Sequence, residues 1–265
     1  MKTYSLIELA GPDAADFGHR MFSRNLKTLS AQEGRLTLFL SAEGKVQSIF
    51  WMVKTDQGLK LIVEQGQQQA LVDLVERYHF SENFKTVLGP TVSSSWRASP
   101  NVGAGVGFLK NQQFVGVWRG TEWIFDLDQL PQSQQPEWSE HRIQNLIPEW
   151  GLDFDTSTLV FEPGLEELCD ENKGCYIGQE IVERVRSRGG QAPRRLALLE
   201  WSQKPQAKSQ SIFSPSQETI GATTETDPVE VNGKWLGLGY LRRGFGTEGS
   251  QIQAQGVSGR CLRSI

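Results

Sequence analysis

Eleven residues decide how this 265-residue sequence is read: Lys173-Gly-Cys-Tyr-Ile-Gly-Gln-Glu-Ile-Val-Glu183. The second half of the stretch continues as an amphipathic helix. Its apolar positions recur every four residues and fall on one face: Ile177, Ile181 and Val185. The helix should end at Gly189-Gly190, since glycine readily adopts the left-handed conformation that closes a helix.

Cys175 lies just before this helix, in a setting that favours the thiolate. Free backbone amides at a helix start carry partial positive charge, and Lys173 adds a cation two residues away. Both effects stabilise a thiolate relative to a thiol. Gly174 and Gly178 have no side chains, so a ligand can approach the backbone closely. The alternative is a buried thiol that packs as a small hydrophobe.

The other cysteines and the histidines show no pattern of a metal or redox site. Cys169 and Cys175 are six residues apart, unlike the tight pairs of zinc or thiol-exchange motifs. We therefore interpret Cys169 and Cys261 as small buried hydrophobes. The three histidines are isolated from one another, at His19, His79 and His141. No stably bound metal is expected.

Composition limits the classes of protein to which this chain can belong. A hydrophobic fraction of 38% and a charged fraction of 22% are typical of a globular protein. Three cysteines do not make a disulfide framework, which favours a reducing compartment. The net charge of −4 argues against extended nucleic-acid binding. We find neither a membrane-spanning run nor a targeting segment, and we expect a cytoplasmic monomer.

Residues 1–82 show the pattern of an N-terminal α+β lobe. Short apolar runs predict strands at residues 5–10, 35–40, 46–53 and 58–64. Apolar residues at helical spacing predict helices at residues 14–26 and 67–78. Asp13 is expected to cap the first helix with its side chain.

Residues 83–190 form a second expected α+β lobe, which carries the motif. Strands are expected at residues 86–89, 106–109, 114–118 and 122–125, followed by a loop at 128–138. At least two helical stretches follow. The run Gly103-Ala-Gly-Val-Gly107 lacks the spacing of a nucleotide-binding loop, and we interpret it as a tight turn.

The pattern changes after Gly189-Gly-Gln-Ala-Pro193, which is the best-marked boundary in the chain. Short strands are expected at residues 196–201, 220–224, 235–241 and 250–257, separated by turn-rich intervals. This spacing predicts a small antiparallel barrel or sandwich over residues 191–265.

The stretch Lys173-Gly-Cys-Tyr-Ile-Gly-Gln-Glu180, followed by Arg184, resembles the signature of the YgfZ family. These folate-binding iron–sulfur cluster factors are related to the glycine-cleavage T-protein, an aminomethyltransferase. Further similarity covers most of the chain, at Gly11–Ala14, Phe39–Val46, Arg142–Asp153, Glu162–Leu165, Ile220–Thr224 and Leu236–Tyr240.

The resemblance implies two α+β lobes and a C-terminal β-barrel around a central channel that holds tetrahydrofolate or a derivative. It also implies a role in the assembly or repair of [4Fe–4S] proteins, including radical enzymes that modify tRNA. Iron–sulfur client or assembly proteins would then be the partners. Cys175 would be the functional thiol, with Lys173 beside it.

By position in the motif, the candidate folate contacts are Tyr176, Gln179, Glu180 and Arg184. Arg184 could instead only pair with Glu180, one helical turn before it.

Two residues outside the motif complete the predicted folate site. Glu162 matches the Glu-Ala-Gly-Leu segment of the T-protein and would bind the pterin edge. The alternative for Glu162 is a solvated acidic face shared with Glu166 and Glu167. Trp51 would line an apolar ligand wall.

Two departures separate the chain from the aminomethyltransferase. Gln47 and Ser48 stand where the T-protein has acidic residues, and neither can act as a carboxylate base. Arg24-Asn25 replaces the family's Asn-Asp pair, which weakens the transfer of pterin contacts to that segment. We therefore expect a folate-binding accessory factor rather than an aminomethyltransferase.

Two alternative functions stay open. The first is a folate-dependent one-carbon transferase. The second is a structural or RNA-associated module that kept the fold without the ligand. For the second, the arginines from Arg184 to Arg195 could touch RNA, or they could form a solvated helix end.

Overall fold

The computed structural model describes residues 3–101, 103–127, 137–206 and 208–265. The chain divides into two compact units. The N-terminal unit comprises Met1–Gln135 and Glu167–Gln179, and the C-terminal unit comprises Pro136–Glu166 and Glu180–Ile265. Lys173–Gln179 of the motif therefore belong to the N-terminal unit, whereas the residues from Glu180 onward belong to the C-terminal unit. The predicted loop at 128–138 lies almost entirely outside the described residues.

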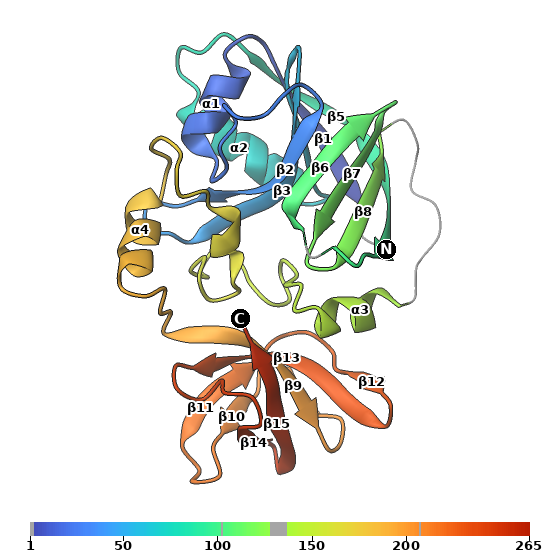
Figure 1. Cartoon of the computed structure of the whole chain (residues 1–265), viewed down its shortest axis with the longest axis vertical. Helices are drawn as coiled ribbons and strands as arrows, with labels where there is room; N and C mark the ends of the chain where they lie inside the picture. The colour runs from blue at the N-terminus through green and yellow to red at the C-terminus, as the bar shows by residue number, and fades with distance from the viewer. Residues whose placement is uncertain (1–2, 102, 128–136, 207) are drawn as a thin grey trace. The chain divides into compact units, whose positions relative to one another are not determined.

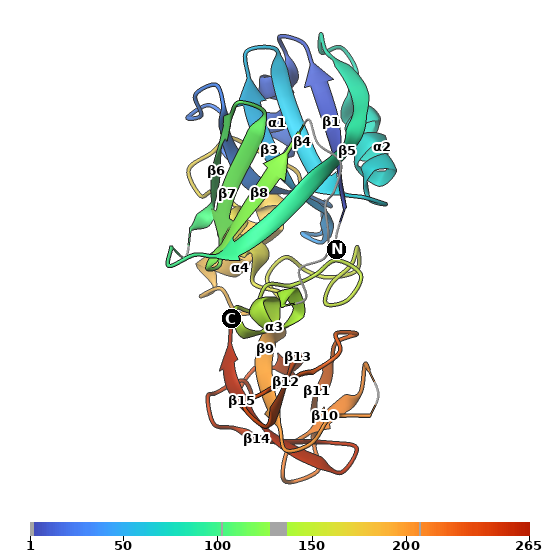
Figure 2. The ribbon, with the colours of Figure 1, turned by 90° about the vertical axis from the view of Figure 1, so that its right-hand side faces the viewer.

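Eight antiparallel strands close a barrel in the N-terminal unit (Figures 1 and 2). In chain order they are β1 (Tyr4–Ala10), β2 (Glu33–Leu40), β3 (Val46–Thr55), β4 (Gly58–Glu64), β5 (Lys85–Ala98), β6 (Ala104–Lys110), β7 (Gln113–Trp118) and β8 (Thr121–Asp126). The barrel closes where β1 pairs with β5 and β2 pairs with β6. Strands from both predicted lobes thus pair in one barrel, and the boundary at residue 82 stays a prediction.

Two helices, α1 (Ala14–Met21) and α2 (Gln68–Tyr78), cover part of the outer surface of this barrel (Figure 1). Because side chains alternate along a strand, one face of β1 and β4 is turned to the helices. That face joins Phe17 of α1 and Leu71 of α2 in one core, with Ile7, Leu9, Leu59 and Leu61. Among the described residues, no helix is long and apolar enough to cross a membrane.

α1 begins at Ala14 as predicted, whereas its cap and its end differ from the prediction. Asp13 has helical backbone angles rather than the extended ones of a capping residue, and its carboxylate accepts the Asn83 N–H at 2.7 Å. The predicted side-chain cap is therefore wrong. The helix ends at Met21, because Phe22 turns to extended backbone and the Ser23 N–H donates to Leu38 O.

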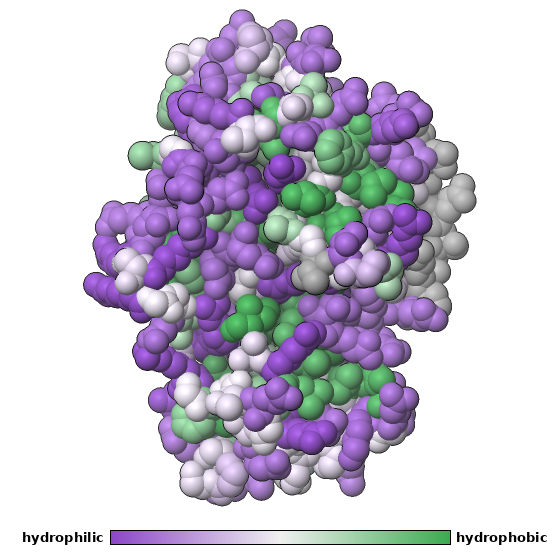
Figure 3. All heavy atoms as spheres, viewed as in Figure 1, coloured by the Kyte–Doolittle hydropathy of each residue, from purple (hydrophilic) through white to green (hydrophobic). Residues whose placement is uncertain are grey.

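Glycines on β6 and β7 make room for large side chains inside the barrel. A Cβ on Gly107 would lie 2.4 Å from the Phe114 ring, and one on Gly116 would lie 2.6 Å from the Trp51 ring. Gly105 and Gly107 lie within strand β6, so the predicted tight turn is wrong. The large residues of β6, Val106 and Phe108, are exposed instead and contribute to the apolar surface over this strand (Figure 3).

Seven short antiparallel strands form the sheet of the C-terminal unit. They are β9 (Arg194–Trp201), β10 (Ser211–Phe213), β11 (Thr219–Thr223), β12 (Val229–Val231), β13 (Lys234–Arg242), β14 (Gln251–Ala254) and β15 (Val257–Ser264). Because β11 pairs with both β10 and β13, the sheet curls into a closed ring, and β12 extends it from β13. The single strand predicted at 250–257 is instead the first arm of the β14–β15 hairpin.

The two faces of strand β9 pack against different groups of residues. Ala197, Leu199 and Trp201 face the core of the curled sheet. Leu196 and Leu198 face a second core that includes Ile143 of α3 (Trp138–Gln144). Because both faces of β9 are apolar, the strand packs the curled sheet against the segment that precedes the motif.

A buried ion network fixes that preceding segment to the sheet. Arg142 is 2% exposed and donates to Asp153 Oδ2 and to Thr226 Oγ1, both at 2.7 Å. Its Nε lies 2.9 Å from Glu149 Oε2. Asp153 Oδ1 accepts the Thr224 hydroxyl at 2.7 Å. Burying such charges is costly, so the network is stable only while each group keeps its partners.

Arg142→Met tests this network. The substitution leaves Asp153 buried without its cation, and we expect the free energy of unfolding to fall by about 3–5 kcal/mol in urea denaturation. Arg260→Met is the control, because Arg260 pairs with Glu200 near the surface, where such pairs contribute about 0–1 kcal/mol. Equal losses in the two variants would contradict the role of Arg142.

Candidate functional site

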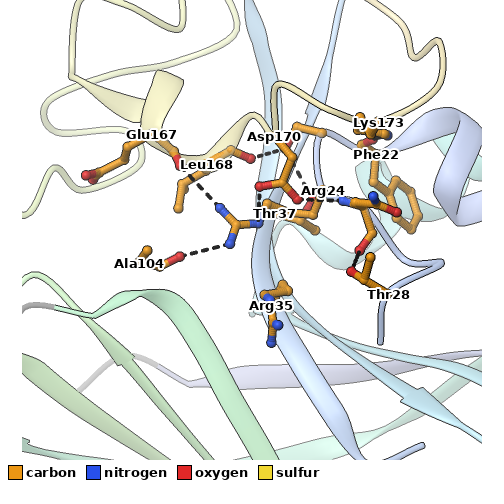
Figure 4. A network of polar contacts seen from close by, with 12 residues as sticks. Phe22, Arg24, Thr28, Arg35, Thr37, Ala104, Glu167, Leu168, Asp170 and Lys173 are labelled. Carbon is orange, nitrogen blue, oxygen red and sulfur yellow. Dashed lines mark hydrogen bonds and ion pairs between the residues drawn. The ribbon is translucent and has the colours of Figure 1, made fainter. Parts of the chain in front are cut away.

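Residues 167–173 are bound to the N-terminal unit by buried hydrogen bonds to the segment that follows α1 (Figure 4). The Ser23 hydroxyl donates to Leu168 O at 2.7 Å, and the Asp170 N–H donates to Ser23 O at 3.0 Å. The Asn25 N–H donates to Asp170 Oδ2 at 2.7 Å. These bonds begin at η1 (Leu165–Leu168) and fix the entry of the chain into the motif.

Arg24 adds a buried cation to the same connection. Its guanidinium donates to Glu167 O at 3.2 Å and to Ala104 O at 3.0 Å, and its Nε lies 3.5 Å from Asp170 Oδ1. Burial lowers the pKa of Arg24 from its ordinary value, and the Asp170 carboxylate opposes that effect. The arginine that replaces the family's asparagine is thus committed to backbone carbonyls and to Asp170.

Lys173 anchors the start of the motif to the end of α1. Its ammonium donates to His19 O at 2.7 Å and to Phe22 O. It also lies 4.5 Å from the centre of the Tyr176 ring, a cation–π contact. Carbonyls at the end of a helix lack partners within the helix and carry partial negative charge, so a cation suits them. Burial lowers the pKa of Lys173 to about 8.

Gly178 anchors the other side of Cys175. Its φ is +83°, and a Cβ at this position would lie 2.5 Å from Ser41 O and 3.0 Å from Leu40 Cβ. Only glycine combines this backbone angle with so close a contact. Ile177 packs against the core beneath the helices. Between the two anchors Cys175 is exposed, whereas Cys169 and Cys261 are buried as predicted.

The motif helix begins later than predicted. α4 spans Gln179–Ser187, so three residues separate Cys175 from its first residue. The field of a helix end acts mainly within the first turn, and the Lys173 ammonium points to the α1 carbonyls. The C-terminal end follows the prediction: Gly189 has φ +84°, and the Gly190 N–H closes the helix by donating to Val185 O.

Three curated proteins are similar to this chain. An aminomethyltransferase of Acidobacterium capsulatum is 27% identical over 101 residues, which are 38% of this chain and 26% of that protein. An uncharacterised protein of Haemophilus influenzae is 23% identical over 86% of this chain and 82% of its own length. An iron–sulfur cluster assembly factor IBA57 homologue of Neurospora crassa, described as mitochondrial, is 26% identical over 69% of this chain and 49% of its own length.

A solved structure shows the fold. The glycine cleavage system aminomethyltransferase T from Bartonella henselae superposes with a TM-score of 0.75 at 14% identity, over 99% of this chain and 83% of that one. The chain has the T-protein fold, and these similarities support a relationship to YgfZ/IBA57-like proteins. The predicted family and a mixed α/β fold built mostly of strands in β-barrel sheets are confirmed. No family model matches the sequence.

The other predicted site residues of this YgfZ/IBA57-like chain are divided between the two units. Trp51 is 3% exposed inside the N-terminal barrel, 5.4 Å from Phe114 between ring centres. Gln179 is the last residue of the N-terminal unit. In the C-terminal unit, Glu180 and Arg184 form the predicted ion pair on the exposed side of α4.

Glu162, also in the C-terminal unit, is 7% exposed, and its Oε2 accepts a hydrogen bond from Arg194 at 2.9 Å. The alternative of a solvated acidic face is therefore wrong for Glu162. The role of each of these residues toward folate stays a prediction.

Sequence reasoning missed the connection that Ser23, Arg24 and Asp170 make between α1 and the motif. Each is a common surface residue type, and Asp170 lies far along the sequence from the other two. No local pattern distinguishes them, because their role depends on the pairing of distant segments. Among the described residues, no group of three or more His, Cys, Asp or Glu side chains could hold a metal ion.

The low pKa of Lys173 predicts a pH dependence of stability. Between about pH 8 and pH 10.5 the unfolded chain holds the proton that folded Lys173 has lost, so the contribution of this residue rises with pH. Below pH 8 both states are charged and the cost of burial is fully present. We expect the difference in unfolding free energy between the wild type and Lys173→Met to rise by on the order of 2–3 kcal/mol across this window.

Urea denaturation at several pH values measures this difference. Lys110→Met, at an exposed position on β6, is measured in parallel to correct for titration elsewhere in the chain. A difference for Lys173→Met that stays flat, or that falls as the pH rises, would contradict the burial of a destabilised ammonium.

Proposed function

We propose that this chain is an accessory factor for the assembly or repair of [4Fe–4S] proteins, with Cys175 as its functional thiol and tetrahydrofolate or a derivative as its ligand. The observation that carries the proposal is the placement of Cys175. It is exposed between the two anchors at Lys173 and Gly178. Thiol reactivity depends on access. An exposed thiol on a fixed backbone is suited to contact one kind of partner, because it is presented to each partner molecule in the same orientation.

The name of one relative supports the part of the proposal that concerns clusters. The Neurospora crassa protein is an iron–sulfur cluster assembly factor, and its similarity covers 69% of this chain. The cluster would be cargo, and thiolate sulfur is the ligand that iron–sulfur clusters prefer. The proposed clients are [4Fe–4S] enzymes, including radical enzymes that modify tRNA.

Glu162 fits one requirement of a bound folate. A pterin offers N–H donors along one edge and needs a fixed acceptor. Glu162 is held in place through Oε2 by Arg194, and within the described structure its Oε1 takes part in no hydrogen bond. That oxygen would accept from the pterin.

The composition of β3 argues against aminomethyl transfer. This strand carries no carboxylate between Val46 and Thr55. Ser48 is buried, and its hydroxyl has no hydrogen-bond partner among the described residues. A hydroxyl cannot act as a carboxylate base. The alternative of a one-carbon transferase rests on the aminomethyltransferase similarity, which covers 38% of this chain.

Complementation tests the role of Cys175. A strain without the gene receives the wild type or Cys175→Ala, and the activity of a [4Fe–4S] enzyme is measured beside the level of the accessory protein. We expect Cys175→Ala to leave activity at the level of the deletion strain. Cys261→Ala is the control, because Cys261 lies buried in the core of the C-terminal sheet. Full restoration by Cys175→Ala would refute the role of the thiol.

Calorimetric titration with tetrahydrofolate tests the ligand. We expect equal affinity for the wild type and Cys175→Ala, and affinity at least about tenfold weaker for Glu162→Gln, since a tenfold loss is about 1.4 kcal/mol. Glu200→Gln, which removes a carboxylate paired with Arg260 near the surface, should bind as the wild type does. An absence of binding to the wild type would refute the folate part of the proposal. Methylene-tetrahydrofolate formation with turnover would favour the transferase.

A further inference from the structure

A surface cavity of about 430 Å³ opens beside α1 in the N-terminal unit. Three of its charged lining groups, Asp13, Arg20 and Glu82, already have partners. Arg20 pairs with Glu82 across the cavity wall, and the Asp13 carboxylate accepts the Asn83 N–H. The remaining charged or titratable lining groups are Asp16, His19 and Lys27. Their side chains make no ion pair within the described structure.

His19 is the buried member of this set. The residue is 6% exposed, and its Nδ1 accepts the Leu26 N–H at 3.3 Å. A nitrogen that accepts a hydrogen bond carries no proton, so the neutral ring has its proton on Nε2. Within the described structure Nε2 has no hydrogen-bond partner. This nitrogen is not one of the fully buried unpaired polar atoms of the described residues, so its N–H is open to water or to a ligand.

The surroundings of His19 keep the ring neutral. Burial lowers its pKa first, followed by the charges of Lys173 and Lys27, whereas Asp16 acts in the opposite direction. Protonation of Nδ1 would also break the bond from Leu26. At neutral pH the ring is therefore a donor through Nε2 and not a base.

The remaining two groups supply one charge of each sign. Asp16 and His19 lie three residues apart on α1 and so share a face of that helix. The Lys27 ammonium is exposed and lines the same cavity. A ligand that satisfies all three groups needs an anionic acceptor for Nε2–H and Lys27, and a cationic donor for Asp16.

One lining residue of the cavity, His19, lies next to the backbone of the motif. A Cβ built on Gly174 would meet only His19 Nε2, at 3.5 Å. Lys173 is bound to the backbone oxygen of the same histidine. Because residue 174 has no side chain, nothing from this position covers the imidazole.

We propose that this cavity binds a small zwitterion of the α-amino acid type. Its carboxylate accepts from His19 Nε2–H and pairs with Lys27, and its ammonium pairs with Asp16. The site is separate from the proposed folate contacts, and its occupancy does not depend on the function of Cys175.

Titration of the full chain with L-alanine tests the proposal, with acetate and methylammonium as the two half-ligands. Binding is followed by calorimetry and by the ring resonances of His19. We expect saturable binding of L-alanine with a Kd of about 1 mM, and binding at least about tenfold weaker for each half-ligand. No saturation by L-alanine would overturn the proposal. Equally tight binding of acetate would also overturn it, because the site would then recognise only an anion.

Matched variants assign the groups. His19→Gln keeps a donor near the position of Nε2, whereas His19→Asn keeps an acceptor for Leu26 and removes the donor. We expect binding to survive in His19→Gln and to weaken at least about tenfold in His19→Asn, Asp16→Asn and Lys27→Met. Asp73→Asn, on α2 and outside the cavity lining, should bind as the wild type does. Unchanged affinity in His19→Asn would refute the role of Nε2–H, and thermal unfolding checks that each variant is folded.

Discussion

The buried ammonium of Lys173 is the interaction on which the geometry of the motif depends. A buried ammonium without partners is costly, and the last carbonyls of a helix have no partners within it. Lys173 and the end of α1 each supply what the other lacks, through His19 O and Phe22 O. The lowered pKa of Lys173 is the remaining cost of that burial. A segment far along the sequence is thereby fixed to the first helix of the chain.

The exposure of Cys175 follows from anchors on both sides of it. With Lys173 alone, the chain beyond could rotate about its backbone and turn the thiol elsewhere. Gly178 removes that freedom, because its left-handed backbone lies against Leu40 and Ser41, where a side chain would not fit. Ile177 adds apolar contact to the core. The glycine that a sequence reading interprets as access for a ligand serves here as a packing position.

Local patterns predicted the strands well and their pairing poorly. The short apolar run at 58–64 predicts β4 at its observed bounds, because that signal lies within a few residues. Barrel closure through β1–β5 and β2–β6 depends on segments far apart, for which a single sequence gives no signal. Arg24 and Asp170 were missed for the same reason. The motif predicted the family and the candidate thiol, whereas the contacts that hold the thiol in place required the fold.

The arginines near the end of the motif helix bear on the alternative of an RNA-associated module. A phosphate-binding surface needs cations that are free to neutralise phosphates. Arg184 pairs with Glu180, Arg186 donates to Glu166 O, Arg194 pairs with Glu162 and Arg195 pairs with Glu166. Four of the five arginines between residues 184 and 195 thus already bind acceptors within the C-terminal unit. The clustering of these arginines in sequence is explained by the acidic groups that they bind. Because these cations are already engaged, the arrangement disfavours nucleic-acid binding and favours a function of the thiol and its ligand.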